Sequence, residues 1–216
     1  MHKRSRLKNA YKIKSFLVLI LYIIFMLQIA CGTTATNDPA IYFRFVLDKK
    51  NGLFQEKTVG DYTYSLQYKP SAYMVLTDNE SFPMNTENFI QQEKEYETKQ
   101  YYTFRIKVAS DTQHLDIVTY NLNSEQEYND RVHYLDNDMQ KDIFLVCGKD
   151  TSTVSSFIYD KSTDLNDYTS FLISFPCSQN IESNRQFIFY DKKFKSGIII
   201  FTIEAAAIAN TPTFLF

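Results

Sequence analysis

The chain reads Tyr-Tyr-Thr-Phe-Arg-Ile-Lys-Val over residues 101–108. From Tyr102 on, aromatic and branched apolar residues occupy every second position, with threonine, arginine and lysine between them. Because successive side chains of a strand point to opposite faces of a sheet, this pattern predicts a strand with one buried face. The stretch indicates a β protein, and the sequence on either side of it extends that interpretation.

Similar short segments recur along the chain. Residues 62–68 alternate tyrosine and leucine with small polar residues until Pro70 ends the run. Further apolar runs cover residues 41–47, 73–76, 115–120, 143–147, 157–159, 171–175, 187–190, 198–203 and 213–216. Asn51-Gly52 is a hairpin-type turn signal, and we expect residues 115–120 to pair with 101–108. Many short strands predict a mainly β chain, an antiparallel β-sandwich with an immunoglobulin- or transthyretin-like layout.

Two segments interrupt the strand pattern. Ser124-Glu125-Gln126-Glu127 is a capping box, and the apolar residues after it recur at helical spacing. This predicts one amphipathic helix, inserted at about 125–139. Residues 77–100 are a polar excursion in which we expect one weak helix, and excursions of this length are usually functional or mobile. We therefore expect residues 41–216 to form a single β-sandwich domain that contains both segments.

Composition excludes several classes of protein. The 18 Phe and 16 Tyr among 216 residues argue against disorder. The net charge of −2 shows no excess of basic residues of the kind that binds nucleic acid. No two of the five glycines lie closer than eight residues apart, which excludes the glycine-rich loops that bind nucleotides. The sequence contains neither an H-E-x-x-H nor a G-x-S-x-G motif. We therefore predict no catalytic residue, no metal ligand and no cofactor.

The N-terminus has the form of an export signal. Six basic residues and no acidic residue lie within residues 1–15, and an unbroken apolar run follows from Phe16 to Leu27. A helix over this run would be about 18 Å long, which is shorter than the ~30 Å hydrocarbon core of a bilayer. The pattern predicts a signal peptide over residues 1–30, with an uncleaved signal anchor as one alternative.

The residues after this run, Leu27-Gln28-Ile29-Ala30-Cys31, resemble the lipobox of bacterial lipoprotein precursors. The resemblance implies cleavage between Ala30 and Cys31, fatty acylation of Cys31 such as with palmitate, and a lipidated tether over residues 31–40. A signal peptide cut after Ala30 without lipidation is the other alternative. The composition, rich in Lys, Asn, Ile, Tyr and Phe, resembles that of lipoproteins of the Bacteroidota type, whose surface-displayed members carry an acidic run after the cysteine. Because residues 32–37 have no such run, this resemblance implies an outer-membrane protein that faces the periplasm.

Cleavage after Ala30 would leave 17 of the 23 basic residues against 25 acidic ones, a net charge of −8. The lipid, rather than charge, would then hold the protein at the membrane. Cys147 and Cys177 remain as one pair that could form a disulfide in an oxidising compartment, or could be two buried thiols.

Three hypotheses for function follow. The first is a non-enzymatic accessory or structural lipoprotein of a cell-envelope assembly, with the membrane and an envelope protein as partners. The alternative is a glycan- or peptide-binding lipoprotein that uses the tyrosine-rich strand face of Tyr62, Tyr64 and Tyr68, although such a stripe is more often the core face of a strand. A hydrolase whose carboxylates the fold brings together is the lesser alternative.

Overall fold

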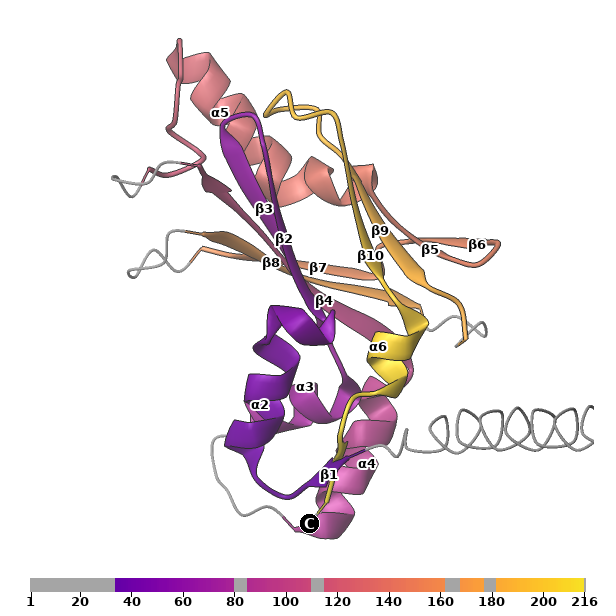
Figure 1. Cartoon of the computed structure of the whole chain (residues 1–216). Helices are drawn as coiled ribbons and strands as arrows, with labels where there is room; N and C mark the ends of the chain where they lie inside the picture. The colour runs from indigo at the N-terminus through magenta and orange to yellow at the C-terminus, as the bar shows by residue number, and fades with distance from the viewer. Residues whose placement is uncertain (1–33, 80–84, 110–114, 162–167, 177–181, 216) are drawn as a thin grey trace, which may run out of the picture. The chain divides into compact units, whose positions relative to one another are not determined.

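The computed structural model describes residues 34–79, 85–109, 115–161, 168–176 and 182–215 (Figure 1). The chain divides into two compact units, Met1–Thr34 and Ala35–Phe216. The predicted cleavage and lipidation site at Ala30 and Cys31 lies outside the described residues.

Two antiparallel sheets form the centre of the second unit. The five-stranded sheet has the order β2 (Phe54–Val59), β3 (Tyr62–Lys69), β4 (Lys99–Val108), β8 (Thr169–Pro176) and β7 (Ser156–Asp160). The four-stranded sheet has the order β10 (Ile198–Ile203), β9 (Arg185–Tyr190), β5 (Ile143–Cys147) and β6 (Asp150–Thr153). A short parallel pair joins β1 (Ala35–Thr36) to β11 (Thr213–Phe214). The prediction of a mainly β chain built from antiparallel sheets is confirmed.

Aromatic side chains fill the space between the two sheets. Phe104 of β4 lies with its ring centroid 5.1 Å from that of Phe187 and 5.4 Å from that of Phe189, both on β9. It also contacts the ring of Phe201 on β10. Because each of these residues belongs to the alternating apolar set of its strand, the period-two pattern selects the buried face of both sheets.

Helices lie at both ends of the sheets (Figure 1). At one end are α2 (Pro39–Leu47), α3 (Ser71–Asp78) and α4 (Thr86–Tyr96), with α6 (Ala205–Ala209) beside them. At the other end is α5 (Glu125–His133), which continues through a π-helical turn (Tyr134–Asp138) and a 3₁₀ turn (Met139–Asp142). The predicted helix at about 125–139 is confirmed, and α4 is the weak helix expected within residues 77–100.

The prediction of a strand over residues 41–47 is wrong, because these residues lie in α2. Asp38 caps this helix by accepting a hydrogen bond from the Ala40 N–H at 2.8 Å, and Pro39 occupies the first turn, where its missing N–H costs nothing. Tyr42 and Val46, one helical turn apart, are the buried residues. Ile41 and Leu47, which the strand would have buried, are about half exposed.

Two other strand assignments are also wrong. Residues 73–76 lie in α3, which begins directly after Pro70. Residues 115–120 form turns, in which the Asp116 carboxylate accepts a hydrogen bond from the Val118 N–H at 2.9 Å. The neighbours of β4 are instead β3 and β8.

The Asn51-Gly52 turn is present, but it does not join two strands. A short 3₁₀ helix, η1 (Lys49–Asn51), ends at Gly52, whose φ of +79° favours glycine, and the chain passes there from α2 into β2.

Candidate functional site

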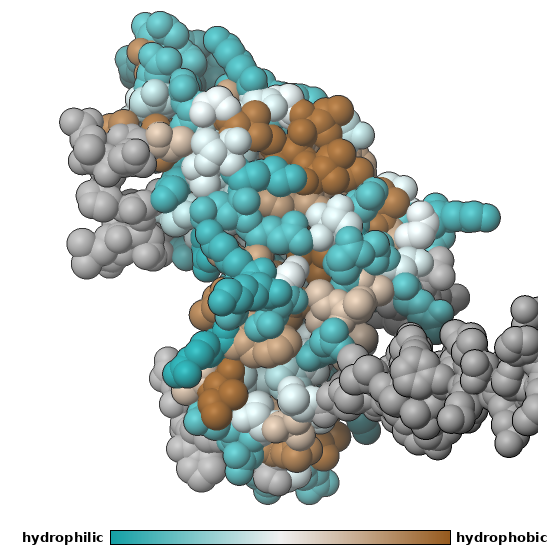
Figure 2. Space-filling model, in the orientation of Figure 1, coloured by the Kyte–Doolittle hydropathy of each residue, from teal (hydrophilic) through white to brown (hydrophobic). Residues whose placement is uncertain are grey.

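The outward face of the four-stranded sheet carries a group of exposed apolar side chains. Tyr190, Ile198 and Ile200 are 42%, 59% and 42% exposed, and Phe144 and Ile188 beside them are half-buried. Figure 2 shows this apolar surface in brown over β9 and β10. The outer face of an antiparallel sheet is normally polar. We call these five residues the apolar face and treat it as the candidate functional site.

Strand register brings the apolar face together. Ile200 lies directly opposite Ile188, which in turn lies opposite Phe144, so three strands contribute one row. Ile198 and Tyr190 form the next row, and the Tyr190 ring meets that of Phe144 edge-on at 5.8 Å. We did not predict this site. The available signal was the unbroken run from residue 198 to residue 201, because a strand with apolar residues at consecutive positions presents some of them outward.

A lysine-rich turn borders the apolar face. Residues 191–197 connect β9 to β10 and carry the exposed lysines Lys192, Lys193 and Lys195. The Lys192 ammonium pairs with the buried carboxylate of Asp142, and the Lys193 ammonium lies 5.7 Å from the ring centroid of Tyr134. We call residues 191–197 the lysine turn.

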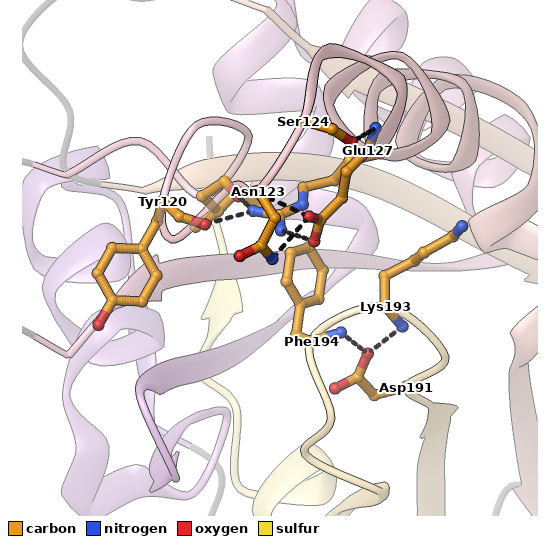
Figure 3. A network of polar contacts seen from close by, with 9 residues as sticks. Tyr120, Asn123, Ser124, Glu127, Asp191, Lys193 and Phe194 are labelled. Atoms are coloured by element: carbon orange, nitrogen blue, oxygen red, sulfur yellow. Dashed lines mark hydrogen bonds and ion pairs between the residues drawn. The ribbon is translucent and has the colours of Figure 1, made fainter.

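The carboxylate of Asp191 fixes the lysine turn (Figure 3). It accepts hydrogen bonds from the backbone N–H groups of Lys193 at 2.9 Å, Phe194 at 2.7 Å and Ser196 at 2.6 Å. The hydroxyl of Tyr64, on β3, reaches the same carboxylate at 3.4 Å. The turn is therefore held to the opposite sheet.

Arg131 holds α5 next to this turn. Arg131 is 5% exposed, and its guanidinium donates hydrogen bonds to the backbone carbonyls of Ile117 at 2.8 Å and Tyr120 at 2.7 Å. It also pairs with Glu127 at 3.1 Å and lies 5.8 Å from the ring centroid of Phe194. The helix, the preceding turns and the lysine turn are thus joined through one buried cation.

The capping box predicted at Ser124 is present in a modified form (Figure 3). The Ser124 hydroxyl accepts from the Glu127 N–H at 3.1 Å. The Glu127 carboxylate accepts from the backbone and side-chain N–H groups of Asn123, at 3.0 and 3.1 Å, rather than from Ser124 itself. These hydrogen bonds lower the pKa of Glu127.

Side chains of β2 cover the edge of the sheet next to the apolar face. β10 is the edge strand, and its Ile200 carbonyl accepts a hydrogen bond from the Lys57 ammonium. The Thr202 carbonyl accepts one from the Gln55 amide. Because unpaired edge groups invite strand addition, these contacts leave the face of the sheet, rather than its edge, as the surface open to a partner.

The three tyrosines predicted as a ligand-binding surface do not form one. Tyr62 is 6% exposed and Tyr64 is fully buried, and the Tyr64 ring packs against those of Phe104 and Phe189. Only Tyr68 is partly exposed, at the end of β3. The period-two pattern that suggested a tyrosine surface is instead the core face of the strand.

The side chain of Cys147 is buried at the end of β5, where its sulfur lies 3.9 Å from the Gln100 amide nitrogen. Cys177 lies outside the described residues, so the disulfide stays a prediction. The ring of His133, at the end of α5, contacts the Asn137 amide at 3.0 Å. Among the described residues no group of three His, Cys, Asp or Glu side chains is arranged to hold a metal ion.

Within the part of the chain that the structure describes, no helix is long and apolar enough to cross a bilayer. Comparison with protein-family models, with curated proteins and with solved structures found no match to this chain.

Proposed function

We propose that this protein is a non-enzymatic lipoprotein, anchored through Cys31, that serves as an accessory component of a cell-envelope assembly and docks a protein partner on its apolar face. The observation that carries this proposal is the exposure of Tyr190, Ile198 and Ile200 on a regular sheet. When a partner covers exposed apolar groups on a rigid surface, the free energy falls because these groups leave water.

The chemistry around the apolar face selects the kind of partner. Three lysines of the lysine turn stand at one end of it. A complementary surface would present apolar side chains bordered by carboxylates, because unlike charges at a rim steer association and favour the correct orientation. Since the β10 edge is covered by Lys57 and Gln55, the partner should pack on the face and not add a strand.

Site-directed photo-crosslinking in the native cells tests the docking surface. A benzophenone side chain replaces Ile200 in the full chain, and the matched control places it at Ile158, which is 55% exposed on β7 of the other sheet. We expect a discrete adduct from position 200 and none from position 158. Ile198→Lys, introduced together with the probe, should abolish the adduct. The absence of an adduct at position 200, or equal adducts at both positions, would contradict the proposed surface.

Lipidation is tested separately. Growth with an alkyne analogue of palmitate should label the wild-type chain, and Cys31→Ser should lose both the label and membrane association. Cys147→Ser, which changes a cysteine buried at the end of β5, is the control and should keep both. Unchanged labelling of the Cys31→Ser variant would contradict the lipoprotein proposal.

The other functions proposed from the sequence have less support. The glycan- or peptide-binding proposal rested on three tyrosines, and two of them lie in the core. The hydrolase proposal requires paired carboxylates in a cleft, and the clearest buried carboxylate, Asp142, is already bound to Tyr134 at 2.9 Å and to Lys192.

A further inference from the structure

The apolar face has a positively charged end. The lysine turn, which lies directly before β10, carries three exposed lysines. The ammonium groups of Lys192 and Lys193 make the contacts described above, with a carboxylate and with an aromatic ring. Lys195 is therefore the lysine of this turn that we expect to pair with a carboxylate of a partner.

The opposite end of the apolar face carries more carboxylates than ammonium groups. The alternation that exposes Ile198 and Ile200 continues to Glu204, which is exposed and directly follows β10. Glu204 precedes α6, but its side chain makes no capping hydrogen bond there. At the same end, Asp150 begins β6 and Lys149 precedes it, and both are exposed. The charges at the two ends of the face are therefore opposite in sign.

One row of the apolar face lies between these two ends. It consists of Ile200, Ile188 and Phe144, which stand opposite one another on three strands. Glu204 follows Ile200 by four residues, and the lysine turn ends three residues before it. At about 3.3 Å per strand residue, each charged end stands on the order of 10–15 Å from the row. A rotation about this row therefore exchanges the positive and the negative end.

Two copies of such a face can pack against each other about a two-fold axis in the plane of the interface. An axis along the strands would place one lysine turn on the other, and like charges would repel. An axis across the strands, along the row of Ile200, Ile188 and Phe144, places the lysine turn of each copy on Glu204 of the other. Because two-fold symmetry is the commonest in protein oligomers and unlike charges fix orientation, the second arrangement is favoured.

This arrangement also matches the side chains of the face. Residues of the central row pack on their own counterparts, so Ile200 meets Ile200 of the second copy. The row of Ile198 and Tyr190 covers the row of Thr202 and Gln186, which are directly opposite each other on β10 and β9. Gln186 is exposed, so its amide is available to the Tyr190 hydroxyl of the second copy. Apolar groups leave water at the centre while polar groups meet at the rim, as in other protein interfaces.

We propose that the partner of the apolar face is a second copy of this chain, packed face to face about a two-fold axis along the row of Ile200, Ile188 and Phe144. This inference rests on the proposed function, because it names the occupant of the same docking surface. The five side chains of the apolar face are fewer than the roughly 20–30 residues that each partner contributes to a standard interface. We therefore expect a weak dimer, which anchoring in a common membrane favours by raising the local concentration.

Crosslinking between differently tagged copies identifies the occupant. Two full chains with different C-terminal tags, both with benzophenone at position 200, are produced together in the native cells. The matched control places the probe at Ile158, on β7 of the other sheet. We expect an adduct that contains both tags from position 200 and none from position 158. An adduct that joins position 200 to a different protein would overturn the second copy but support the docking surface, whereas no adduct at all would contradict both.

Charge reversal tests the orientation of the two copies. Because a two-fold interface contains each contact twice, Glu204→Lys and Lys195→Glu each change two charge pairs. Each should lower the yield of the two-tag adduct about 5-fold or more, and the double variant should restore it to within about 2-fold of the wild type. Glu95→Lys, on the exposed side of α4, controls for net charge and should leave the yield unchanged. A double variant that fails to restore the adduct, or an equal loss in Glu95→Lys, would overturn the proposed dimer.

Discussion

The hydroxyl of Tyr64 lies 2.7 Å from the hydroxyl oxygen of Ser196 and donates a hydrogen bond to it. Tyr64 stands on β3 of the five-stranded sheet, and Ser196 stands in the lysine turn that joins β9 to β10 of the other sheet. The pair connects the aromatic core to the turn that borders the apolar face. Burial raises the pKa of Tyr64 above its ordinary value, so the hydroxyl remains a donor over the physiological range.

Removing this hydroxyl should loosen the turn. Tyr64→Phe keeps the ring in the core but leaves Asp191 and Ser196 with one donor fewer, and we expect a loss of about 1–2 kcal/mol in the free energy of unfolding. Tyr190→Phe changes an exposed tyrosine and should cost less than about 0.5 kcal/mol. Urea unfolding followed by circular dichroism measures both, and equal losses would contradict this role for Tyr64.

Arg131 should be the main attachment of α5. Arg131→Met leaves the carbonyls of Ile117 and Tyr120 without their donor, at an expected cost of about 2–3 kcal/mol. Amide exchange along α5 should accelerate. Gln126→Ala, on the same helix, removes only an exposed hydrogen bond to Asp130 and should cost less than about 0.5 kcal/mol. Undisturbed exchange in the Arg131→Met variant would show that α5 is held elsewhere.

Neighbouring isoleucines on β10 test which face of that strand meets the core. Ile199 is 1% exposed and Ile200 is 42% exposed. Ile199→Ala should cost about 2–4 kcal/mol through cavity formation, and Ile200→Ala less than about 1 kcal/mol. Because a shift of one residue in register would exchange the two faces, the reverse order of losses would contradict the assignment of the apolar face. Thermal unfolding of the two variants is the measurement.

The sandwich could be predicted because alternation at residues such as 102–108 reports directly on burial. The helix α2 could not be predicted from alternation, because Ile41, Phe43, Phe45 and Leu47 fit a strand as well as a helix. Asp38 and Pro39 decide between the two, as a cap and a first-turn proline. The apolar face depends on strand register, which joins residues far apart in sequence.

Two buried glutamines should respond in opposite directions to the same substitution. Gln67, on β3, is 1% exposed, and neither atom of its amide has a hydrogen-bond partner among the described residues. Gln67→Leu should therefore raise the free energy of unfolding by about 1 kcal/mol, since an unsatisfied polar group leaves the interior. The Gln100 amide contacts Tyr102, Arg185, Pro176 and Cys147. Because Gln100→Leu removes these contacts, it should lower the free energy of unfolding by about 2 kcal/mol. Chemical denaturation measures the free energy of unfolding of both variants. A loss of stability in Gln67→Leu would indicate that the Gln67 amide is hydrogen-bonded in the wild-type chain.

The stability of the α3–α4 contact should depend on pH through Glu93. Burial is the main cause that raises the pKa of this carboxyl above its ordinary value of 4.5, although the Ser71 hydroxyl, 3.2 Å away, acts in the opposite direction. The folded chain therefore holds the proton of the Glu93 carboxyl more tightly than the unfolded chain does. The stability that the protonated form contributes is complete below pH 4.5, and it is lost as the pH rises through the folded-state pKa. Glu93→Gln keeps an acceptor for Ser71 and removes the charge, so it should be more stable than wild type at neutral pH, with the difference vanishing in acid. Urea midpoints measured over a pH series test this, and Glu95→Gln on the exposed side of α4 controls for the change in net charge. A difference that stayed constant across the series would mean that the Glu93 charge is not the cause.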